Sequence, residues 1–343
     1  MRMILNLPCK VKKWTMFIKS RSVLVFLPIV IAVGFACNQA INETNFVNKN
    51  RSREDVKAVI DSSSPVVTEV QVMATTSIVT EWVNQVGGNR IYTDSIMPHS
   101  VNPHTYQPGA KDVARITQSK QIFAIGLMYE RSWLTKLLDS YPDINVVNLG
   151  DFIEPIEFND GEPEHDNNRG QFDPHFWFDP TRVSVAVTKI ANVLSEIDPD
   201  GAAYYENRAG EYITELNELD SHIANEILKI PDSERLIMTE HESLGYLGDR
   251  YNVEIFRAII PSFSSESGPT PKDLVIAIDL INKHNIPVIF IENETNDKSG
   301  ERVVEETSIK LAKGLSVETL RDGQTYIDFM KYNIAIIVSN LVD

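Results

Sequence analysis

The sequence predicts an α/β protein of two lobes, each a mainly parallel sheet flanked by helices, with one long helix joining them. Short apolar runs typical of buried strands alternate with amphipathic segments between residues 70 and 150, and again between residues 235 and 342. Such alternation indicates strand–helix–strand units and parallel pairing. Between the two regions, residues 202–228 form one uninterrupted helical pattern, which would span roughly 40 Å at 1.5 Å per residue. A helix of this length can support both lobes.

The amino-terminal residues 1–37 have the composition of a secretory signal. They contain six basic residues and no acidic residue, and their apolar run (23–36) has 14 residues, fewer than the roughly 20 that cross a bilayer as a helix. The run ends at Cys37, in a segment (VGFAC) that resembles the lipid-attachment site of bacterial lipoproteins. We expect a lipidated Cys37 as the new amino-terminus. A retained membrane anchor and a soluble periplasmic protein are the alternatives.

The segment that follows, residues 38–65, is polar and lacks apolar periodicity, which indicates a tether between the anchor and the folded body. The whole chain has a formal net charge of −16, and removal of the basic leader leaves about −22 for the remainder. This balance argues against nucleic acid as a partner, because phosphate binding needs clustered Lys and Arg. An acidic exterior mildly attracts cations.

The N-terminal lobe is assigned to residues 66–180. Its first helix has apolar residues at helical spacing and ends at Gly87-Gly88, a helix-stop signal. The predicted strands of this lobe are residues 70–76, 90–97, 121–126 and 144–150, and the predicted helices are residues 77–88, 111–119 and 129–141.

A helical connection is assigned to residues 181–230 and the C-terminal lobe to residues 231–343. The connection contains helices over residues 181–197 and 202–228. The longer helix carries one apolar stripe, formed by Tyr205, Ala209, Tyr212, Leu216, Leu219, Ile223 and Ile227. The C-terminal lobe is predicted to contain strands at residues 235–241, 253–259, 286–292 and 315–320, and helices at residues 270–285 and 324–342.

Three of the seven histidines lie at the ends of predicted elements: His104 in NPHTYQP, His175 in DPHFWFDP and His241 in MTEHESLGY. In open α/β sheets, ligands bind beyond the carboxyl ends of the strands, so these positions are candidates for a common site. No local metal or catalytic motif supports them, because Gly245 stands where the zincin motif HExxH needs its second histidine. From the residues alone, a single loop histidine is more often a hydrogen-bonded structural residue than a metal ligand, and three at comparable positions strengthen the ligand interpretation only moderately.

Five segments taken in order resemble the solute-binding lipoproteins of bacterial zinc and manganese ABC importers. The resemblance extends from about Val70 to the carboxyl terminus, and the segments that carry it are residues 102–112, 173–180, 198–220, 239–251 and 288–295. It implies two α/β lobes joined by one long helix, with a single metal ion held in the cleft between the lobes.

The resemblance also implies the ligands. The family's histidine positions correspond to His104, His175 and His241, and its late acidic ligand corresponds to Glu318, with Asp297 and Glu292 as alternatives. Histidine rather than glutamate at position 241 is typical of zinc-type members. Three imidazoles and one carboxylate suit four-coordinate zinc, whereas manganese prefers more oxygen ligands. Four protein ligands would leave no position for an activated water, which argues against hydrolysis.

We therefore expect an extracytoplasmic, lipid-anchored, monomeric component of an ABC importer, which captures Zn²⁺ with high affinity and delivers it to a membrane permease. A manganese- or iron-binding member of the same family is the first alternative. Two alternatives belong to other classes: a zinc-dependent hydrolase with Glu318 or Glu242 as its base, and a surface adhesin with a structural metal.

The remaining histidines, His99, His165, His222 and His284, are not expected to be ligands. The three aromatic residues 176–178 are expected to exclude water around His175. Carboxylates beside the predicted ligands could orient the imidazoles or only cap helices and bind solvent; they are Asp173, Asp179, Glu240 and Glu242. Tyr246 could support the site or belong to the core.

Overall fold

The structure is a computed structural model that describes residues 70–99, 101–157, 172–260, 262, 268–293 and 298–342. The predicted leader, Cys37 and the tether over residues 38–65 lie outside the described residues. Among the helices of the described part, none is both long and apolar enough to cross a membrane.

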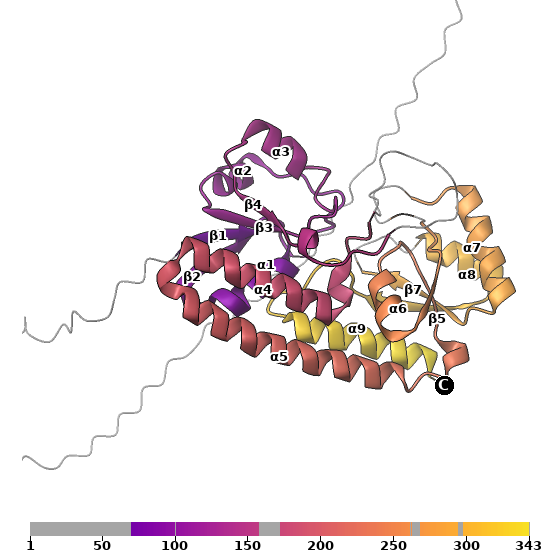
Figure 1. Ribbon diagram of the computed structural model, residues 1–343. Helices are drawn as coiled ribbons and strands as arrows, with labels where there is room; N and C mark the ends of the chain where they lie inside the picture. Colours follow the sequence, from indigo (N-terminus) through magenta and orange to yellow (C-terminus); the bar gives the residue numbers. More distant parts are fainter. Residues whose placement is uncertain are drawn as a thin grey trace, which may run out of the picture. The chain divides into compact units, whose positions relative to one another are not determined.

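The first sheet is parallel throughout and has the strand order β2-β1-β3-β4 (Figure 1). Its strands are β1 (Val70–Ala74), β2 (Ile91–Ser95), β3 (Gln121–Ala124) and β4 (Val146–Asn148). The helices between them are α1 (Ser77–Gly87), α2 (Ala110–Ile116) and α3 (Leu134–Ser140). Helix α1 begins where the Thr76 side chain accepts a hydrogen bond from the Val79 N–H, an N-cap that satisfies one of the free amides of the first turn.

The second sheet repeats this arrangement with the order β6-β5-β7-β8, again parallel. Its strands are β5 (Leu236–Thr239), β6 (Glu254–Phe256), β7 (Val288–Glu292) and β8 (Lys310–Leu315). Its helices are α6 (Gly245–Tyr251), α7 (Pro271–His284) and α8 (Lys298–Thr307). The predicted fold class, two parallel-sheet lobes flanked by helices, is confirmed.

Three long helices complete the fold: α4 (Pro180–Ile197), α5 (Ala202–Ile227) and α9 (Tyr326–Leu341). The predicted apolar stripe of α5 is buried. This helix packs against α1 and α4 and also against α6 and α9 (Figure 1). One hydrophobic core is shared by elements of both sheets, and a smaller core includes residues of the second sheet, α7 and α8. The division into residues 66–180, 181–230 and 231–343 stays a prediction.

Two predicted elements differ from the structure, and two helices, α6 and α8, were not predicted. The helix expected over residues 129–141 begins only at Leu134, because the buried Glu130 carboxylate accepts hydrogen bonds from the N–H groups of Ile125 and Gly126 and holds the preceding residues in turns. The short helix α6 had no predicted counterpart. Its segment contains Gly245 and Gly248, which lower the helix propensity.

The strand predicted over residues 315–320 is wrong. The strand is β8, which ends at Leu315, and residues 316–320 form a loop. The prediction failed because Val317 and Leu320 are apolar and fully buried, as in a strand. Their backbone is nevertheless bound elsewhere: the Leu320 N–H donates to the Ser77 hydroxyl, and Asn333 of α9 binds both backbone groups of Ser316.

Substitution of Asn333 tests this account of the loop. The buried Asn333 amide accepts from the Ser316 N–H at 3.0 Å and donates to the Ser316 carbonyl at 2.6 Å. Asn333→Ala should lower the free energy of unfolding by about 2 kcal/mol, because two buried hydrogen bonds are lost. Urea unfolding would measure it, with Asn340→Ala as the control, since that amide donates to a carbonyl of its own helix, that of Ile336. Equal effects of the two substitutions would contradict the account.

Candidate metal centre

The four predicted ligands lie in loops at the ends of regular elements. His104 lies in the loop between β2 and α2, and its N–H donates to the Asn102 side chain at 2.9 Å. His175 comes just before a 3₁₀ turn (Phe176–Phe178) and the start of α4. His241 follows β5 closely, and Glu318 lies in the loop after β8. The fold thus brings together residues that are far apart in the sequence.

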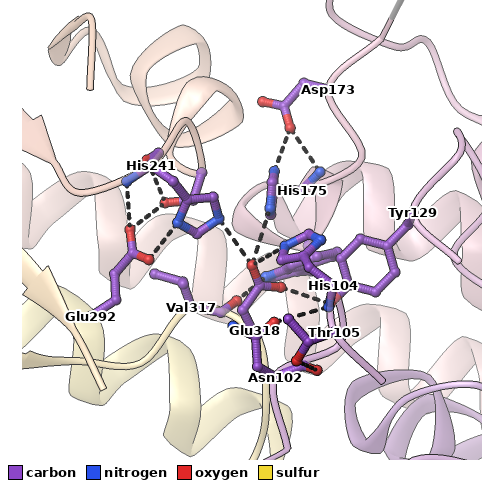
Figure 2. A network of polar contacts seen from close by, with 12 residues as sticks. Asn102, His104, Thr105, Tyr129, Asp173, His175, His241, Glu292, Val317 and Glu318 are labelled. Carbon is purple, nitrogen blue, oxygen red and sulfur yellow. Dashed lines mark hydrogen bonds and ion pairs between the residues drawn. The ribbon is translucent and has the colours of Figure 1, made fainter. Parts of the chain in front are cut away.

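The three imidazoles converge on a single oxygen atom. The distances from Glu318 Oε1 are 2.9 Å to His104 Nε2, 3.0 Å to His241 Nε2 and 3.4 Å to His175 Nε2 (Figure 2). The four ligand atoms all lie within 4.8 Å of one another, and all four residues are buried. Such a cluster of three nitrogens and one carboxylate oxygen has the donor set of a tetrahedral metal site.

The two alternatives for the fourth ligand are placed differently. Glu292, at the end of β7, contacts Nδ1 of His241, on the far side of that ring from Glu318 (Figure 2). Asp297 lies outside the described residues.

Two carboxylates behind the rings set which nitrogen carries the hydrogen. His175 Nδ1 donates to Asp173 Oδ1 at 2.7 Å, and the same oxygen accepts from the His175 backbone N–H at 2.8 Å. His241 Nδ1 donates to Glu292 Oε2, whose other oxygen accepts from the Ser243 hydroxyl at 3.3 Å. With the hydrogen on Nδ1, a neutral ring directs the lone pair of its Nε2 toward the centre, as a metal ligand requires.

This arrangement needs positive charge at its centre, because Nε2 lone pairs would otherwise face the lone pairs of Glu318. Burial lowers the pKa of His175, but Asp173 and Glu318 outweigh that effect and raise it to about 9. Burial also lowers the pKa of His241, and Glu292 and Glu318 raise it well above its ordinary value. Burial raises the pKa of Glu318, whereas the three imidazoles, His104 first, hold it well below its ordinary range. In the absence of a cation, protons supply the charge.

Residues 176–178 were predicted to exclude water around His175. The structure places Trp177 against that ring, while Phe176 packs against Trp82 and Phe178 against Phe329. All three are fully buried, and the Trp177 ring lies 5.0 Å from that of His175. The Trp177 N–H donates to the Val317 carbonyl at 2.9 Å, which fixes the residue next to Glu318. This packing keeps bulk water from one side of the site and strengthens its electrostatic interactions.

The structure also decides between interpretations that the sequence left open. Asp173 orients His175, and Tyr246 supports Asp173 by donating to its carbonyl at 2.7 Å. A Cβ on Gly245 would lie 2.6 Å from Asp173 Oδ2, so this position has little room for a larger residue. Asp179 caps α4 by accepting from the Thr181 N–H at 2.8 Å.

The other histidines of the described part do not join the cluster. His99 Nδ1 lies 2.9 Å from the Leu320 carbonyl, and His284 packs against Phe256. His222 lies on α5, and His165 lies outside the described residues. One contributor was missed by the sequence reasoning: Tyr129 donates to Glu318 Oε2 at 2.6 Å. No motif in the sequence marks this tyrosine.

Comparison with known protein families identifies the chain. Residues 72–340 match the family model described as zinc-uptake complex component A, periplasmic (ZnuA). The chain belongs to this family. The members are substrate-binding proteins of metal ABC transporters and not enzymes, so the family resemblance predicted from the sequence is confirmed.

Curated relatives cover most of the chain at modest identity. The manganese ABC transporter substrate-binding lipoprotein scaA of Streptococcus gordonii is 29% identical over 290 residues, which are 81% of this chain and 90% of the relative. The manganese-binding lipoprotein MntA of Halalkalibacterium halodurans is 27% identical over 278 residues, with 79% and 88% covered.

Among solved structures, the periplasmic zinc-binding protein TroA of Treponema pallidum superimposes with a TM-score of 0.72 at 22% identity, covering 80% of this chain and 100% of TroA. A crystal structure of ZnuA superimposes with a TM-score of 0.69 at 23% identity, covering 80% of this chain and 99% of the other. Both likenesses support the two-lobe fold of this chain.

The charge balance of the site predicts how the metal-free protein responds to pH. The folded pKa of His175, about 9, exceeds its ordinary value of 6.5. Its stabilising contribution is therefore complete below about pH 6.5 and is lost as the pH rises through about 9. His241 acts in the same direction. The pKa of Glu318 is lowered, so its contribution to stability is present above the ordinary pKa of a glutamate and is lost as the pH falls through the lowered value.

Urea unfolding in the presence of a chelator should therefore show a falling free energy of unfolding between about pH 6.5 and 9. Asp173→Asn should reduce this dependence, because the amide oxygen still accepts a hydrogen bond but carries no charge to hold the His175 proton. A flat profile for the unsubstituted protein over this range would contradict the charge assignment.

Proposed function

We propose that this protein is the extracytoplasmic zinc-binding component of an ABC importer, which captures Zn²⁺ and delivers it to a membrane permease. One observation carries the proposal: the Nε2 atoms of His104, His175 and His241 converge on the Glu318 carboxylate at 2.9–3.4 Å in a buried cluster. We take these four residues as the ligands. An ion at this centre would replace the protons that the metal-free site needs.

Capture fits the cluster better than catalysis. Four protein donors complete a tetrahedral shell, whereas catalytic zinc sites use three and keep one position for water. Glu242, the base considered for a hydrolase, accepts a hydrogen bond from the Ala258 N–H at 3.0 Å and is not a member of the cluster. Family membership also argues against the hydrolase.

The donor set favours zinc over the other divalent ions. Imidazole nitrogen suits zinc, whereas manganese prefers carboxylate, carbonyl and water oxygens in an octahedral shell. The cluster offers three nitrogens and one carboxylate. At a common site, the general order of affinities also places zinc above manganese.

Manganese is the second candidate, because several relatives are named as manganese-binding or manganese-transporter lipoproteins. Elemental analysis of protein purified without added metal separates the two ions. We expect zinc in near-stoichiometric amount. Manganese in excess of zinc would favour the second candidate.

The proposal also includes the attachment of the protein to the membrane and its partner there. Relatives are named lipoproteins of ABC transporters, which supports a lipid anchor at Cys37, a tether over residues 38–65 and a permease partner in the same membrane. A soluble periplasmic form remains the alternative. We further propose that the protein acts as a monomer.

Isothermal titration of the chelator-treated protein tests metal capture. The unsubstituted protein should bind one zinc ion tightly. His175→Ala should weaken binding by more than the about 10–100-fold typical for loss of an outer-shell partner, because it removes a ligand. His222→Ala, at a half-buried position of α5 that is not part of the cluster, is the matched control and should bind as the parent does. The absence of tight 1:1 binding in the parent, or unchanged binding in His175→Ala, would refute the proposal.

The apparent zinc affinity measured in this titration should depend on pH. Since the raised pKa values of His175 and His241 keep protons on the metal-free site at neutral pH, zinc must displace them. The apparent affinity should rise with pH up to about 9 and fall in acid, and titrations in buffers of different ionisation enthalpy should show proton release on binding. Binding without proton release at pH 7 would contradict this mechanism.

A further inference from the structure

The second oxygen of Glu318 has its own partner. While Oε1 faces the three imidazoles, Oε2 accepts the Tyr129 hydroxyl hydrogen at 2.6 Å (Figure 2). Tyr129 is 5% exposed and Glu318 is 2% exposed, so this is a charge-assisted hydrogen bond in a buried environment. Such bonds are shorter and stronger than neutral ones. The two oxygens of the carboxylate are therefore not equivalent.

The turn before Tyr129 is held in an unfavourable conformation. Gly126, Leu127 and Met128 have φ angles of 81°, 51° and 70°, and the left-handed region is costly for leucine and methionine. Such conformations persist only where the surroundings impose them, and they cluster at functional sites.

Glu130, the residue after Tyr129, supplies that constraint. Its buried carboxylate accepts from the Ile125 N–H at 2.8 Å, from the Gly126 N–H at 3.1 Å and from the Thr75 hydroxyl at 2.6 Å. The strained turn is thereby fixed on both sides of Leu127 and Met128. The position of the Tyr129 ring is set by the first lobe, and not by Glu318 alone.

From this geometry we propose that Tyr129 is a positioning residue that keeps Glu318 monodentate and so selects a four-coordinate ion. The inference rests on the proposed function, in which Glu318 is a ligand. A carboxylate that binds through Oε1 alone completes a shell of four with three imidazoles, which suits zinc. A carboxylate free to bind through both oxygens would add a fifth donor, which suits an ion that prefers more oxygen ligands, such as manganese.

The test compares two tyrosine-to-phenylalanine substitutions in the otherwise unchanged protein. Tyr129→Phe removes the hydroxyl that binds Glu318 Oε2. Tyr205→Phe is the matched control, because its hydroxyl donates to the Asp198 carboxylate at the same distance, 2.6 Å, at the start of α5. Phenylalanine fills nearly the same volume, so both variants should fold, which circular dichroism of the metal-free proteins would check.

Two readouts report coordination and selectivity. Cobalt(II) absorbs visible light much more strongly in a tetrahedral site than in a five- or six-coordinate site. The parent and Tyr205→Phe loaded with Co²⁺ should show the strong bands, and Tyr129→Phe should show weaker ones. In competition titrations, Tyr129→Phe should raise the ratio of manganese affinity to zinc affinity by about tenfold, since a hydrogen bond to a charged group is involved.

The outcomes separate this inference from the proposed function. If the parent binds neither Zn²⁺ nor Co²⁺, the proposed function fails and the inference fails with it. If the parent binds both ions, but Tyr129→Phe keeps the cobalt spectrum and the affinity ratio of the parent, the inference is overturned and the proposed function stands. A change of both readouts in Tyr205→Phe as well would also overturn it, because the effect would then not depend on Glu318.

Discussion

Three imidazole nitrogens face one carboxylate oxygen inside this protein, and the charge that this convergence requires governs the rest of the site. His104, His175 and His241 surround Glu318 Oε1, and all four residues are buried. Because Asp173 and Glu292 place hydrogens on the outer nitrogens, the inner atoms are acceptors that repel one another unless a cation lies between them. Bound protons supply this positive charge weakly and reversibly, whereas a metal ion supplies it through directed bonds to the ligand atoms.

The four ligands are far apart in the sequence, and only the tertiary fold brings them together. His241 follows β5 closely, and Glu318 lies in the loop after β8 of the second sheet, while His104 follows the end of β2 in the first. Hydrogen bonds from two separate parts of the chain hold the loop that carries Glu318. The Asn333 side chain binds the backbone of Ser316, and the Trp177 N–H donates to the carbonyl of Val317. The position of the carboxylate therefore depends on α9 and on the residues around His175 together.

Regular periodicity made much of this architecture predictable. The stripe of α5 and the strand–helix alternation followed from the spacing of apolar residues, but the loop over residues 316–320 was mistaken for a strand because it buries Val317 and Leu320. The four candidate ligands could be named only through the order of motifs along the chain, since His104, His175 and His241 share no local spacing rule. Tyr129 and the role of Glu292 could not be predicted, because they depend on contacts between residues 51 to 189 positions apart.

The site thus combines a donor set suited to zinc with a carboxylate whose second oxygen is already bound, and the central claim is that these residues form a four-coordinate shell. X-ray absorption at the zinc edge of the zinc-loaded protein tests it most directly. The account predicts four nearest neighbours at about 2.0–2.2 Å, with the outer-shell scattering of three imidazoles. A shell with fewer than three imidazoles, or with five or six light-atom neighbours, would contradict it.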